Sequence, residues 1–516
     1  MLAAIRSAAV LGIDAYDVTV ETDAANGLPQ FTVVGLPAGA VRESRERVSA
    51  ALVNSGFTLP PRRLTVNLAP ADVRKEGTSF DLPIALGILV ATGQLSSESV
   101  ARVVVAGELG LDGSIRPVRG VLSMARIAAR ASDRPSFIVP PANAAEASLV
   151  GGLRVIAVPT LTELVAHVRR GSLPDTIAPK ASASSAVEAE PLDLADVAGQ
   201  ESAKRALEVA AAGGHNLLLV GPPGAGKTML ARRLPGILPS LTEEERLEAT
   251  AIHSVAGTLA GGVIQSRPFR APHHSVSSAG LVGGGSAPRP GEVSLAHHGV
   301  LFLDELLEFP RSVLDALRQP LEEGRVVIAR ASASVAFPAR FTLVGAMNPC
   351  PCGYSGDAAR GCVCASADVV QYRARLSGPL ADRIDMHVTV GAVPILVLGG
   401  RGDEQSSAVR ARVELARARQ RERYGSLRGV ECNAHVSGRW LDAHGGMTAG
   451  ARTLLIAAAD RLLLSARGYH RVLKVARTIA DLDGEHEIGE PQVAEALRYR
   501  PSVTSSAPLH AVAAGR

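Results

Sequence analysis

Residues 216–229 read NLLLVGPPGAGKTM, and this stretch decides the fold of the region around it. The apolar run at 216–220 is typical of a buried strand in a parallel sheet, and a glycine-rich loop follows it directly. A helical pattern begins at Met229 and completes a strand–loop–helix unit. The loop matches the phosphate-binding pattern G-x-x-x-x-G-K-[ST] at every defined position. The sequence therefore predicts an α/β nucleotide-binding core.

The loop supplies groups that can hold the phosphates of ATP. Glycines let backbone N–H groups turn inward, beside a helix N-terminus that carries partial positive charge. Lys227 is expected to reach the β- and γ-phosphates, and the Thr228 hydroxyl to bind Mg²⁺. The predicted nucleotide-binding residues of the loop are Gly221, Pro222, Pro223, Gly224, Ala225, Gly226, Lys227 and Thr228.

Two further apolar runs end in polar residues. Residues 300–303 lead into Asp304 and Glu305, and residues 341–347 lead into Asn348. Ligands bind at the carboxyl ends of the strands in open α/β sheets. Asp304 is therefore expected to bind Mg²⁺ together with Thr228, and Glu305 to orient or deprotonate the attacking water. The Asn348 amide can hold that water near the γ-phosphate.

Bulk composition bounds the class of protein. A chain of 516 residues, 47% hydrophobic and 20% charged, has material for more than one globular domain. Its apolar runs fall short of the roughly 18 residues that span a bilayer. The first residues resemble a strand more than a signal peptide, so a cytoplasmic location without membrane contact is expected. A net charge of +4 and 3% aromatic residues do not by themselves indicate a nucleic-acid binder.

The chain divides into regions of different pattern. Residues 1–170 alternate short β-rich runs with alanine-rich helical stretches, which indicates an α+β or α/β domain. Residues 171–192 lack periodicity and are rich in Ala, Ser, Pro and Glu, as linkers are. Residues 193–400 are expected to form the ATPase core, a parallel sheet with helices on both faces. Residues 401–516 are expected to form a helical lid.

Several stretches beyond the loop carry a family resemblance. They are RAPHHS at 270–275, PGEVSLAHHG at 290–299, AMNPCPCGY at 346–354, LSGPLADRID at 376–385 and SARGYHR at 465–471. Together they resemble the AAA+ superfamily, in the helix-2-insert branch that contains magnesium-chelatase ATPase subunits and MCM helicases. The sequence is most similar to the ComM/YifB family of magnesium-chelatase-like proteins, over nearly the whole chain.

The resemblance implies a homo-hexamer whose subunits complete one another's sites. Arg383 resembles the arginine finger, which stabilises charge on the γ-phosphate of ATP bound to the next subunit. A salt bridge to Asp382 or Asp385 is the competing role for this arginine. Arg467 resembles the sensor arginine of the lid, with Arg471 as the alternative one turn later.

The resemblance also implies an ATP-hydrolysing motor that acts on DNA, by branch migration or helicase activity in recombination and natural transformation. The hairpin-like segment 325–337 resembles a pore-facing hairpin, in which Arg330 is the candidate DNA contact. A basic stretch supports DNA binding, but it fits a solvated, salt-bridged helix face equally well. Its residues are Arg410, Arg412, Arg417, Arg419, Arg421 and Arg423. The alternative is a chelatase-type or chaperone-type remodelling ATPase that does not act on DNA.

The N-terminal region resembles the Lon-protease domain, with its S5-like fold, but lacks one part of that site. Ser79 falls at the nucleophile position, whereas the lysine that should activate it is replaced by Leu122. No lysine occurs between residues 76 and 179. The resemblance therefore implies the fold without peptidase activity, and Ser79 becomes a helix N-cap or a loop residue.

Four of the five cysteines form two Cys-x-Cys pairs separated by a short glycine-containing loop. They are Cys350, Cys352, Cys362 and Cys364. Four thiolates in so short a span can bind Zn²⁺ tetrahedrally, although the spacing is tighter than the usual C-x-x-C. Four reduced cysteines in a loop are the alternative. The expected cofactors are therefore ATP and Mg²⁺, with zinc as a further candidate.

Overall fold

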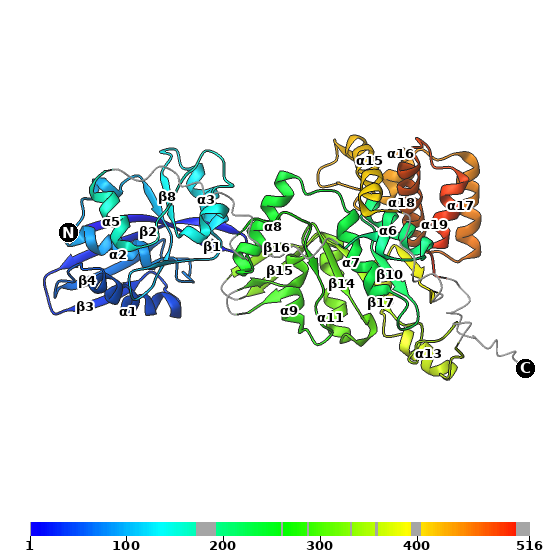
Figure 1. Cartoon of the computed structure of the whole chain (residues 1–516), viewed down its shortest axis with the longest axis horizontal. Coiled ribbons are helices and arrows are strands. Elements are labelled where there is room, and N and C mark those ends of the chain that lie inside the picture. The colour runs from blue at the N-terminus through cyan, green and yellow to red at the C-terminus, as the bar shows by residue number, and fades with distance from the viewer. Residues whose placement is uncertain are drawn as a thin grey trace, which may run out of the picture.

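The computed structural model describes residues 2–171, 192–259, 262–285, 288–330, 333–356, 360–393 and 404–501. Figure 1 shows an elongated molecule in which the N-terminal sheet, the ATPase sheet and the C-terminal helices follow one another along the long axis. Most of the predicted linker, residues 172–191, and the predicted domain boundary after residue 400 lie outside the described residues.

The N-terminal unit is built on a seven-stranded mixed sheet in the order β3-β4-β2-β1-β5-β8-β9. The pairs β1–β2 and β2–β4 are antiparallel, whereas β5, β8 and β9 run parallel. The strands are β1 (Leu2–Leu11), β2 (Asp14–Ala25), β3 (Gln30–Val34), β4 (Arg63–Ala69), β5 (Val103–Val105), β8 (Ser136–Val139) and β9 (Arg154–Ala157), beside the short pair β6 (Glu108–Leu109) and β7 (Ile115–Arg116). The helices are α1 (Gly39–Asn54), α2 (Asp81–Ala91), α3 (Val121–Arg130), α4 (Ala144–Ala147) and α5 (Leu161–Arg169). This is the α+β arrangement expected from the sequence.

The ATPase unit contains a five-stranded sheet in the order β11-β14-β17-β10-β18, and every neighbouring pair is parallel. The strands are β10 (Leu217–Val220), β11 (Phe269–Arg270), β14 (Val300–Leu303), β17 (Thr342–Met347) and β18 (Met386–Thr389). The structure confirms the strands predicted before the phosphate loop, before Asp304 and before Asn348. Because the strands are parallel, their carboxyl ends share one edge of the sheet.

Helices cover both faces of this sheet. Leu217 and Leu219 pack with α6, α7 and the lid, whereas Leu218 packs with α9 to α12. Side chains alternate along a strand, so burial on both faces requires an uninterrupted apolar run, which is what residues 217–220 supply. The helices are α6 (Glu201–Gly213), α7 (Lys227–Ile237), α8 (Glu243–Ala256), α9 (Ser278–Val282), α10 (Glu292–Leu295), α11 (Arg311–Ala316), α12 (Arg318–Glu323), α13 (Ser366–Arg373) and α14 (Gly378–Ala381).

The ATPase unit also contains two hairpins. The first, between Lys227 and Asp304, pairs β12 (Gly283–Gly284) with β13 (Arg289–Pro290). The second hairpin, β15 (Arg325–Arg330) with β16 (Ala333–Pro338), confirms the pairing expected at 325–337. The hairpin tip at 331–332 and the side chain of Arg330 lie outside what the structure describes.

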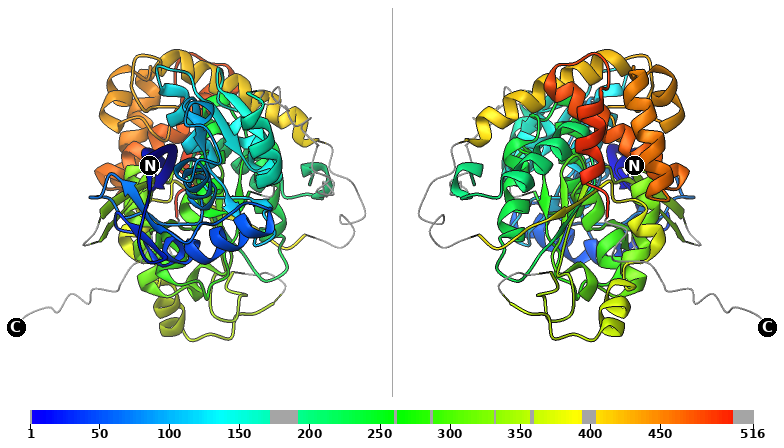
Figure 2. Two further views of the ribbon diagram at one scale, coloured as in Figure 1. Left: turned by 90° about the vertical axis from the view of Figure 1, so that its left-hand side faces the viewer. Right: turned by 90° about the vertical axis from the view of Figure 1, so that its right-hand side faces the viewer.

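The C-terminal lid is helical, as expected, and lies above the ATPase sheet in Figures 1 and 2, on the side opposite to α13. Its helices are α15 (Ser406–Tyr424), α16 (Gly438–His444), α17 (Ala449–Arg461), α18 (Ala466–Asp483) and α19 (Glu490–Arg498). The apolar faces of α15 and α18 join the core that contains α6 and α7.

Most arginines of the basic stretch on α15 hold the lid in place. Arg410 donates to the Gly236 carbonyl oxygen (2.8 Å), and Arg417 to that of Ala211 (3.1 Å). Arg412 pairs with Glu208 and Glu404, while Arg419 and Arg423 bond to Asp481. Arg421 is the member of the set for which no side-chain partner is found among the described residues. The stretch is therefore neither a free DNA-binding face nor a purely solvated one.

Candidate nucleotide site

The phosphate loop joins β10 to α7, as the sequence predicts. Gly224 and Gly226 adopt left-handed backbone conformations, with φ of +78° and +87°, which glycine enters without steric cost. A Cβ atom at either position would meet no other described atom within 4 Å. The loop therefore leaves open space in front of the helix that begins at Lys227.

Lys227 is folded back onto the loop. Its Nζ donates to the carbonyl oxygens of Gly221 (2.7 Å) and Pro222 (2.9 Å), and to Oδ1 of Asn348 (3.1 Å). Burial lowers the pKa of Lys227, and two nearby carboxylates oppose that shift. This cation is partly desolvated, so its attraction for a phosphate oxygen is stronger than it would be in water.

Adjacent strand ends bring the other polar groups together. Asp304 follows β14, Asn348 follows β17 and the phosphate loop follows β10, and these strands are neighbours in that order. The Thr228 hydroxyl donates to Oδ2 of Asp304 over 2.7 Å. The two oxygen ligands predicted for Mg²⁺ therefore lie side by side.

Glu305 stands at the turn after β14. Its φ of +49° is unusual for a residue with a side chain, and backbone strain of this kind is concentrated at functional sites. The backbone N–H of Glu305 donates to Oδ1 of Asp304 (3.0 Å). Its side chain is 63% exposed, so it can meet the solvent water that it is predicted to activate.

His274 also lies at this site, which its place in the sequence did not predict. Its Nδ1 lies 3.8 Å from Oε2 of Glu305, and its ring meets Phe309 edge-on at 6.4 Å between centroids. The histidine follows β11, the sheet neighbour of β14. The available signal was therefore positional, because a polar residue shortly after a strand of this sheet lies near the ligand edge.

The residues present fit ATP with Mg²⁺. The loop N–H groups and Lys227 would hold the phosphates, while Thr228 and Asp304 would hold Mg²⁺, which neutralises phosphate charge. Glu305 and Asn348 supply a carboxylate and an amide for the attacking water. The carboxyl edge of the sheet thus carries each group predicted to act within one subunit.

Arg383 lies at the opposite edge of the same sheet. Its carbonyl oxygen accepts a hydrogen bond from Nδ2 of Asn216 (2.9 Å), the residue that precedes β10. Its guanidinium pairs with Glu322 and donates to the Pro379 carbonyl oxygen (2.6 Å). The length of β10 therefore separates Arg383 from the phosphate loop of its own chain.

The aspartates considered as partners of Arg383 face Arg471 instead. Arg471 Nε lies 3.7 Å from Oδ1 of Asp385, and its Nη1 lies 3.9 Å from Oδ1 of Asp382. Arg471 therefore faces the two aspartates that were the candidate partners of Arg383. Arg383 itself pairs with Glu322.

Arg467, at the start of α18, joins the cluster at this edge. The hydrogen bond from Arg383, with weaker attraction from Arg467 and Arg318, lowers the pKa of Glu322. The fold thus gathers Arg383, Arg467 and Arg471 at the amino edge of the sheet, away from the phosphate loop.

The four clustered cysteines lie together in the segment that follows Asn348. Their sulfur atoms all lie within 4.8 Å of one another. The Sγ atoms of Cys350 and Cys352 are 3.4 Å apart, and each lies 3.6 Å from that of Cys362. The backbone N–H of Cys352 donates to the Sγ of Cys364 (3.4 Å). Residues that the sequence places in two pairs therefore form one four-sulfur cluster.

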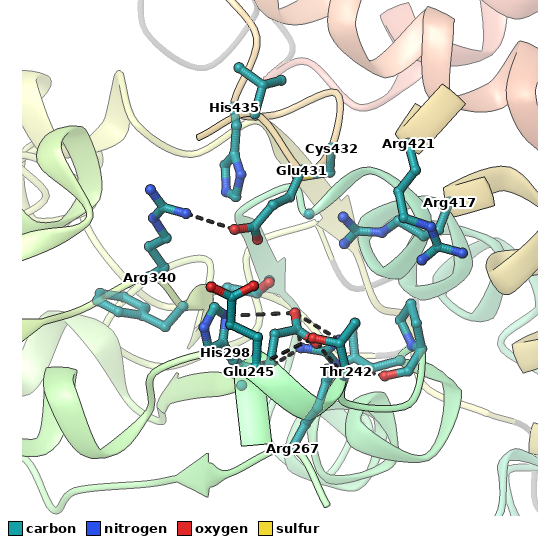
Figure 3. Close-up of a pocket in the computed structure, with 18 of the residues that line it drawn as sticks. Thr242, Glu245, Arg267, His298, Arg340, Arg417, Arg421, Glu431, Cys432 and His435 are labelled. Carbon is teal, nitrogen blue, oxygen red and sulfur yellow. Dashed lines mark hydrogen bonds and ion pairs between the residues drawn. The ribbon is translucent and has the colours of Figure 1, made fainter. Parts of the chain in front are cut away.

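A separate cavity of about 530 Å³ lies between α8 and the lid (Figure 3). His298 and Glu245 lie on one side of it, and Arg417 and Arg421 on the other. His298 donates to Glu248 from Nε2 (2.8 Å), as the adjacent His297 does over 3.2 Å. None of the described lining residues belongs to the phosphate loop, so this cavity is distinct from the nucleotide site.

His297 is a buried packing residue beside this cavity. Its Nδ1 accepts the backbone N–H of Arg340 (3.0 Å), so the neutral ring carries its proton on Nε2 and donates to Glu248. Burial lowers the pKa of His297 to about 4, which keeps the ring neutral. With both nitrogens engaged, this ring has no lone pair left for a metal ion.

In the N-terminal unit, Ser79 is a loop residue. The N-cap of α2 is Phe80, and the Ser79 carbonyl oxygen accepts the Gly107 N–H (3.0 Å). Leu122, at the position where a lysine was sought, is completely buried. Lys75, four residues before Ser79, was not predicted to be special, yet it is completely buried. Its Nζ has no hydrogen-bond partner among the described residues, and burial lowers its pKa.

Among the described residues, no helix is both long enough and apolar enough to cross a membrane.

Comparison with known proteins accounts for most of the chain. The family model "Magnesium chelatase, subunit ChlI" matches residues 193–396, "Subunit ChlI of Mg-chelatase" matches 20–143, and "Magnesium chelatase, subunit ChlI C-terminal" matches 403–500. The competence protein ComM of Haemophilus influenzae is 47% identical over 97% of this chain and 98% of its own length.

Other relatives differ in how much of the chain they cover. YifB of Escherichia coli is 42% identical, with 97% of both chains covered. The magnesium-chelatase 38 kDa subunit of Rhodobacter capsulatus is 30% identical, but over only 33% of this chain and 53% of its own. The similarity to ComM and YifB thus includes the N-terminal unit, whereas the similarity to the chelatase subunit does not extend over the whole chain.

Proposed function

The chain belongs to the ComM/YifB family of magnesium-chelatase-like AAA+ proteins, and from that premise we propose that it is a hexameric ATP-driven motor acting on DNA. Membership of this family implies ATPase activity. The proposed motor drives branch migration of recombination intermediates, including those formed when transforming DNA is integrated. The full-length similarity to a protein named for competence supports this role over a chelatase role.

The observation that carries the proposal is the position of the arginine cluster. Arg383 and Arg467 lie at the amino edge of the sheet, whereas the phosphate loop lies at its carboxyl edge. A cation that stabilises the γ-phosphate must approach it within hydrogen-bond distance. Because these arginines cannot do so in their own chain, they are proposed to act on ATP held by a neighbouring subunit, and a closed ring supplies such a neighbour to every site.

The proposed DNA contacts are the two hairpins, and not the arginines of α15. Five of the six arginines on that helix are engaged in bonds that hold the lid. The hairpins β12–β13 and β15–β16 belong to the unit that carries the proposed ATPase site. Movement of these hairpins with each hydrolysis step would displace a strand held in the ring.

The proposal is tested by measuring the ATPase rate and strand exchange of the purified protein with forked DNA and Holliday junctions. Junction DNA should raise the ATPase rate. Labelled junctions should be separated into duplex products by branch migration only with ATP. Stimulation by a chelatase partner with porphyrin, but not by DNA, would favour a chelatase-type ATPase. Unfolding of a protein client without any DNA effect would favour a chaperone-type ATPase.

The four-cysteine cluster is proposed to bind Zn²⁺. Zinc–sulfur bonds of about 2.3 Å place the sulfurs of a tetrahedral site about 3.8 Å apart, close to the 3.4–3.6 Å separations observed. Elemental analysis of the purified full-length protein should find about one zinc per chain. Cys362→Ser should lower that content, whereas Cys432→Ser, in the lid, should not.

A further inference from the structure

The cysteine cluster is connected to the nucleotide site by a very short segment. Asn348 directly follows the strand β17, and Cys350, two residues later, is completely buried within the cluster. Asn348 Oδ1 accepts a hydrogen bond from Lys227 (3.1 Å). Anything that displaces Cys350 must therefore displace the neighbouring amide that touches the phosphate-binding lysine.

A second connection runs directly to the phosphate loop. Gly353, next to Cys352, packs so closely on Pro223 that a Cβ atom there would lie 2.6 Å from Pro223 Cδ and 3.9 Å from Asn348 Cγ. The Gly353 N–H donates to the carbonyl oxygen of Cys350 (3.0 Å), which fixes this turn to the cluster. The cluster thus supports both the phosphate loop and Asn348.

The described part of this segment is held by few contacts outside the cluster, among them a hydrogen bond from Arg360 to the Tyr354 hydroxyl (2.9 Å). No helix or strand occurs in the described residues between β17 and α13. Hydrogen bonds to sulfur, such as that from the Ser355 N–H to Cys350 (3.2 Å), and one from Arg373 to the Pro349 carbonyl oxygen (3.0 Å), fix its course. In a segment without secondary structure, a bound metal ion supplies the cross-links that ordering requires.

We propose that the metal-loaded cysteine cluster is a positioning device for hydrolysis, which holds Asn348 and Pro223 in register with the nucleotide. This inference rests on the zinc proposal. ATP affinity comes chiefly from the loop amides and Lys227, whereas the cluster reaches the loop through Gly353 on Pro223, a residue that has no N–H to donate to a phosphate. Loss of the metal should therefore affect kcat far more than KM, because small displacements of a group that orients the attacking water are costly.

Substitutions at two glycines in the same segment can distinguish this positioning role from a general effect on the stability of the segment. Gly353 and Gly356 both have left-handed backbones, with φ of +88° and +84°, so alanine is strained equally at either position. Only at Gly353 would the added methyl group meet Pro223, since at Gly356 no described atom lies within 4 Å. Gly353→Ala therefore disturbs the contact without removing a thiol, and Gly356→Ala is its matched control.

The experiment compares full-length protein with metal, after removal of metal by a chelator, and after reloading with Zn²⁺ or Co²⁺. Removal should lower kcat by roughly 100-fold with less than about a threefold change in KM, and reloading should restore it. Gly353→Ala should retain the metal but lose turnover similarly, while Gly356→Ala should retain both. The thiolate–Co²⁺ absorption bands should shift when a non-hydrolysable ATP analogue binds, because binding and site geometry are coupled reciprocally.

The outcomes separate the two proposals. Purified protein that contains no metal, and whose absorption is unchanged by added Co²⁺, would end the zinc proposal and this inference with it. Metal-bound protein whose kcat survives both chelation and Gly353→Ala, and whose Co²⁺ bands ignore the nucleotide, would leave the zinc proposal standing and overturn the positioning role.

Discussion

The two edges of the ATPase sheet differ in what they can do alone. At the carboxyl edge, Lys227, Thr228, Asp304 and Asn348 already touch one another within a single chain. At the amino edge, Arg383 carries a charge suited to phosphate, and its partners among the described residues are the Glu322 carboxylate and the Pro379 carbonyl oxygen. The difference teaches that the charges predicted to meet at the γ-phosphate stand on opposite edges of one subunit, which is the arrangement expected if a second copy brings them together.

Removal of the phosphate-binding lysine at the carboxyl edge tests this comparison most directly. Lys227→Ala should weaken ATP binding by at least roughly 100-fold, because it removes charge-assisted hydrogen bonds to the phosphates. Binding of a fluorescent ATP analogue measures the effect. Lys204→Ala, which removes a lysine that pairs with the exposed Glu201 (3.3 Å), is the control and should bind normally. Normal binding by Lys227→Ala would remove the loop from the site.

Disabling the amino edge should leave binding intact and stop turnover. Arg383→Ala should lower kcat by roughly 10³-fold, the usual effect of losing an arginine that acts across a subunit boundary. Mixing it with Lys227→Ala should recover part of the activity, because some interfaces then join an intact loop to an intact Arg383. Arg311→Ala, at an exposed arginine of α11, should hydrolyse ATP normally. Full activity of Arg383→Ala alone would reduce this residue to a salt-bridge partner of Glu322.

The division of roles within the carboxyl edge can be sharpened with Glu305→Gln. This variant should bind ATP with normal affinity but hydrolyse it roughly 10² to 10³-fold more slowly, because an amide cannot take a proton from water. Stopped-flow phosphate release and analogue binding measure the two properties separately. Glu308→Gln is the control. It removes the carboxylate whose Oε2 lies 3.7 Å from Nη1 of Arg375, and it should hydrolyse ATP normally. Equal losses in both variants would argue against a specific role for Glu305.

The smallest expected effect concerns the histidine that approaches Glu305. His274→Ala should lower kcat by roughly tenfold without changing KM, since its ring helps to hold the carboxylate and does not touch the nucleotide. His273→Ala is a matched control, because that ring bonds to Ser275 (2.8 Å) and not to Glu305. A change in KM, or equal effects of the two substitutions, would show that His274 acts only on folding of the segment.

The sequence predicted the elements whose chemistry is local. The apolar run 217–220, the loop that ends at Thr228 and the acidic pair after β14 are contiguous, and a buried parallel strand leaves little choice about where its carboxyl end must lie. The convergence of the four cysteines was also foreseeable, because two pairs so close in the chain are easily brought together. The positions of His274 and Lys75 were not foreseen, since each depends on how separate segments pack.

What the amino-acid sequence determined by itself was the nucleotide-binding core, the candidate residues and the family to which the chain belongs. Only the tertiary structure decided that Arg410, Arg412 and Arg417 of α15 bind the lid to the core, that Arg383 lies across the sheet from its own phosphate loop and that Gly353 supports Pro223. The physical reason is that the strand–loop–helix pattern is set by neighbours in the chain. The partner of a long charged side chain, or the neighbour on which a glycine packs, is set by elements far away in the chain.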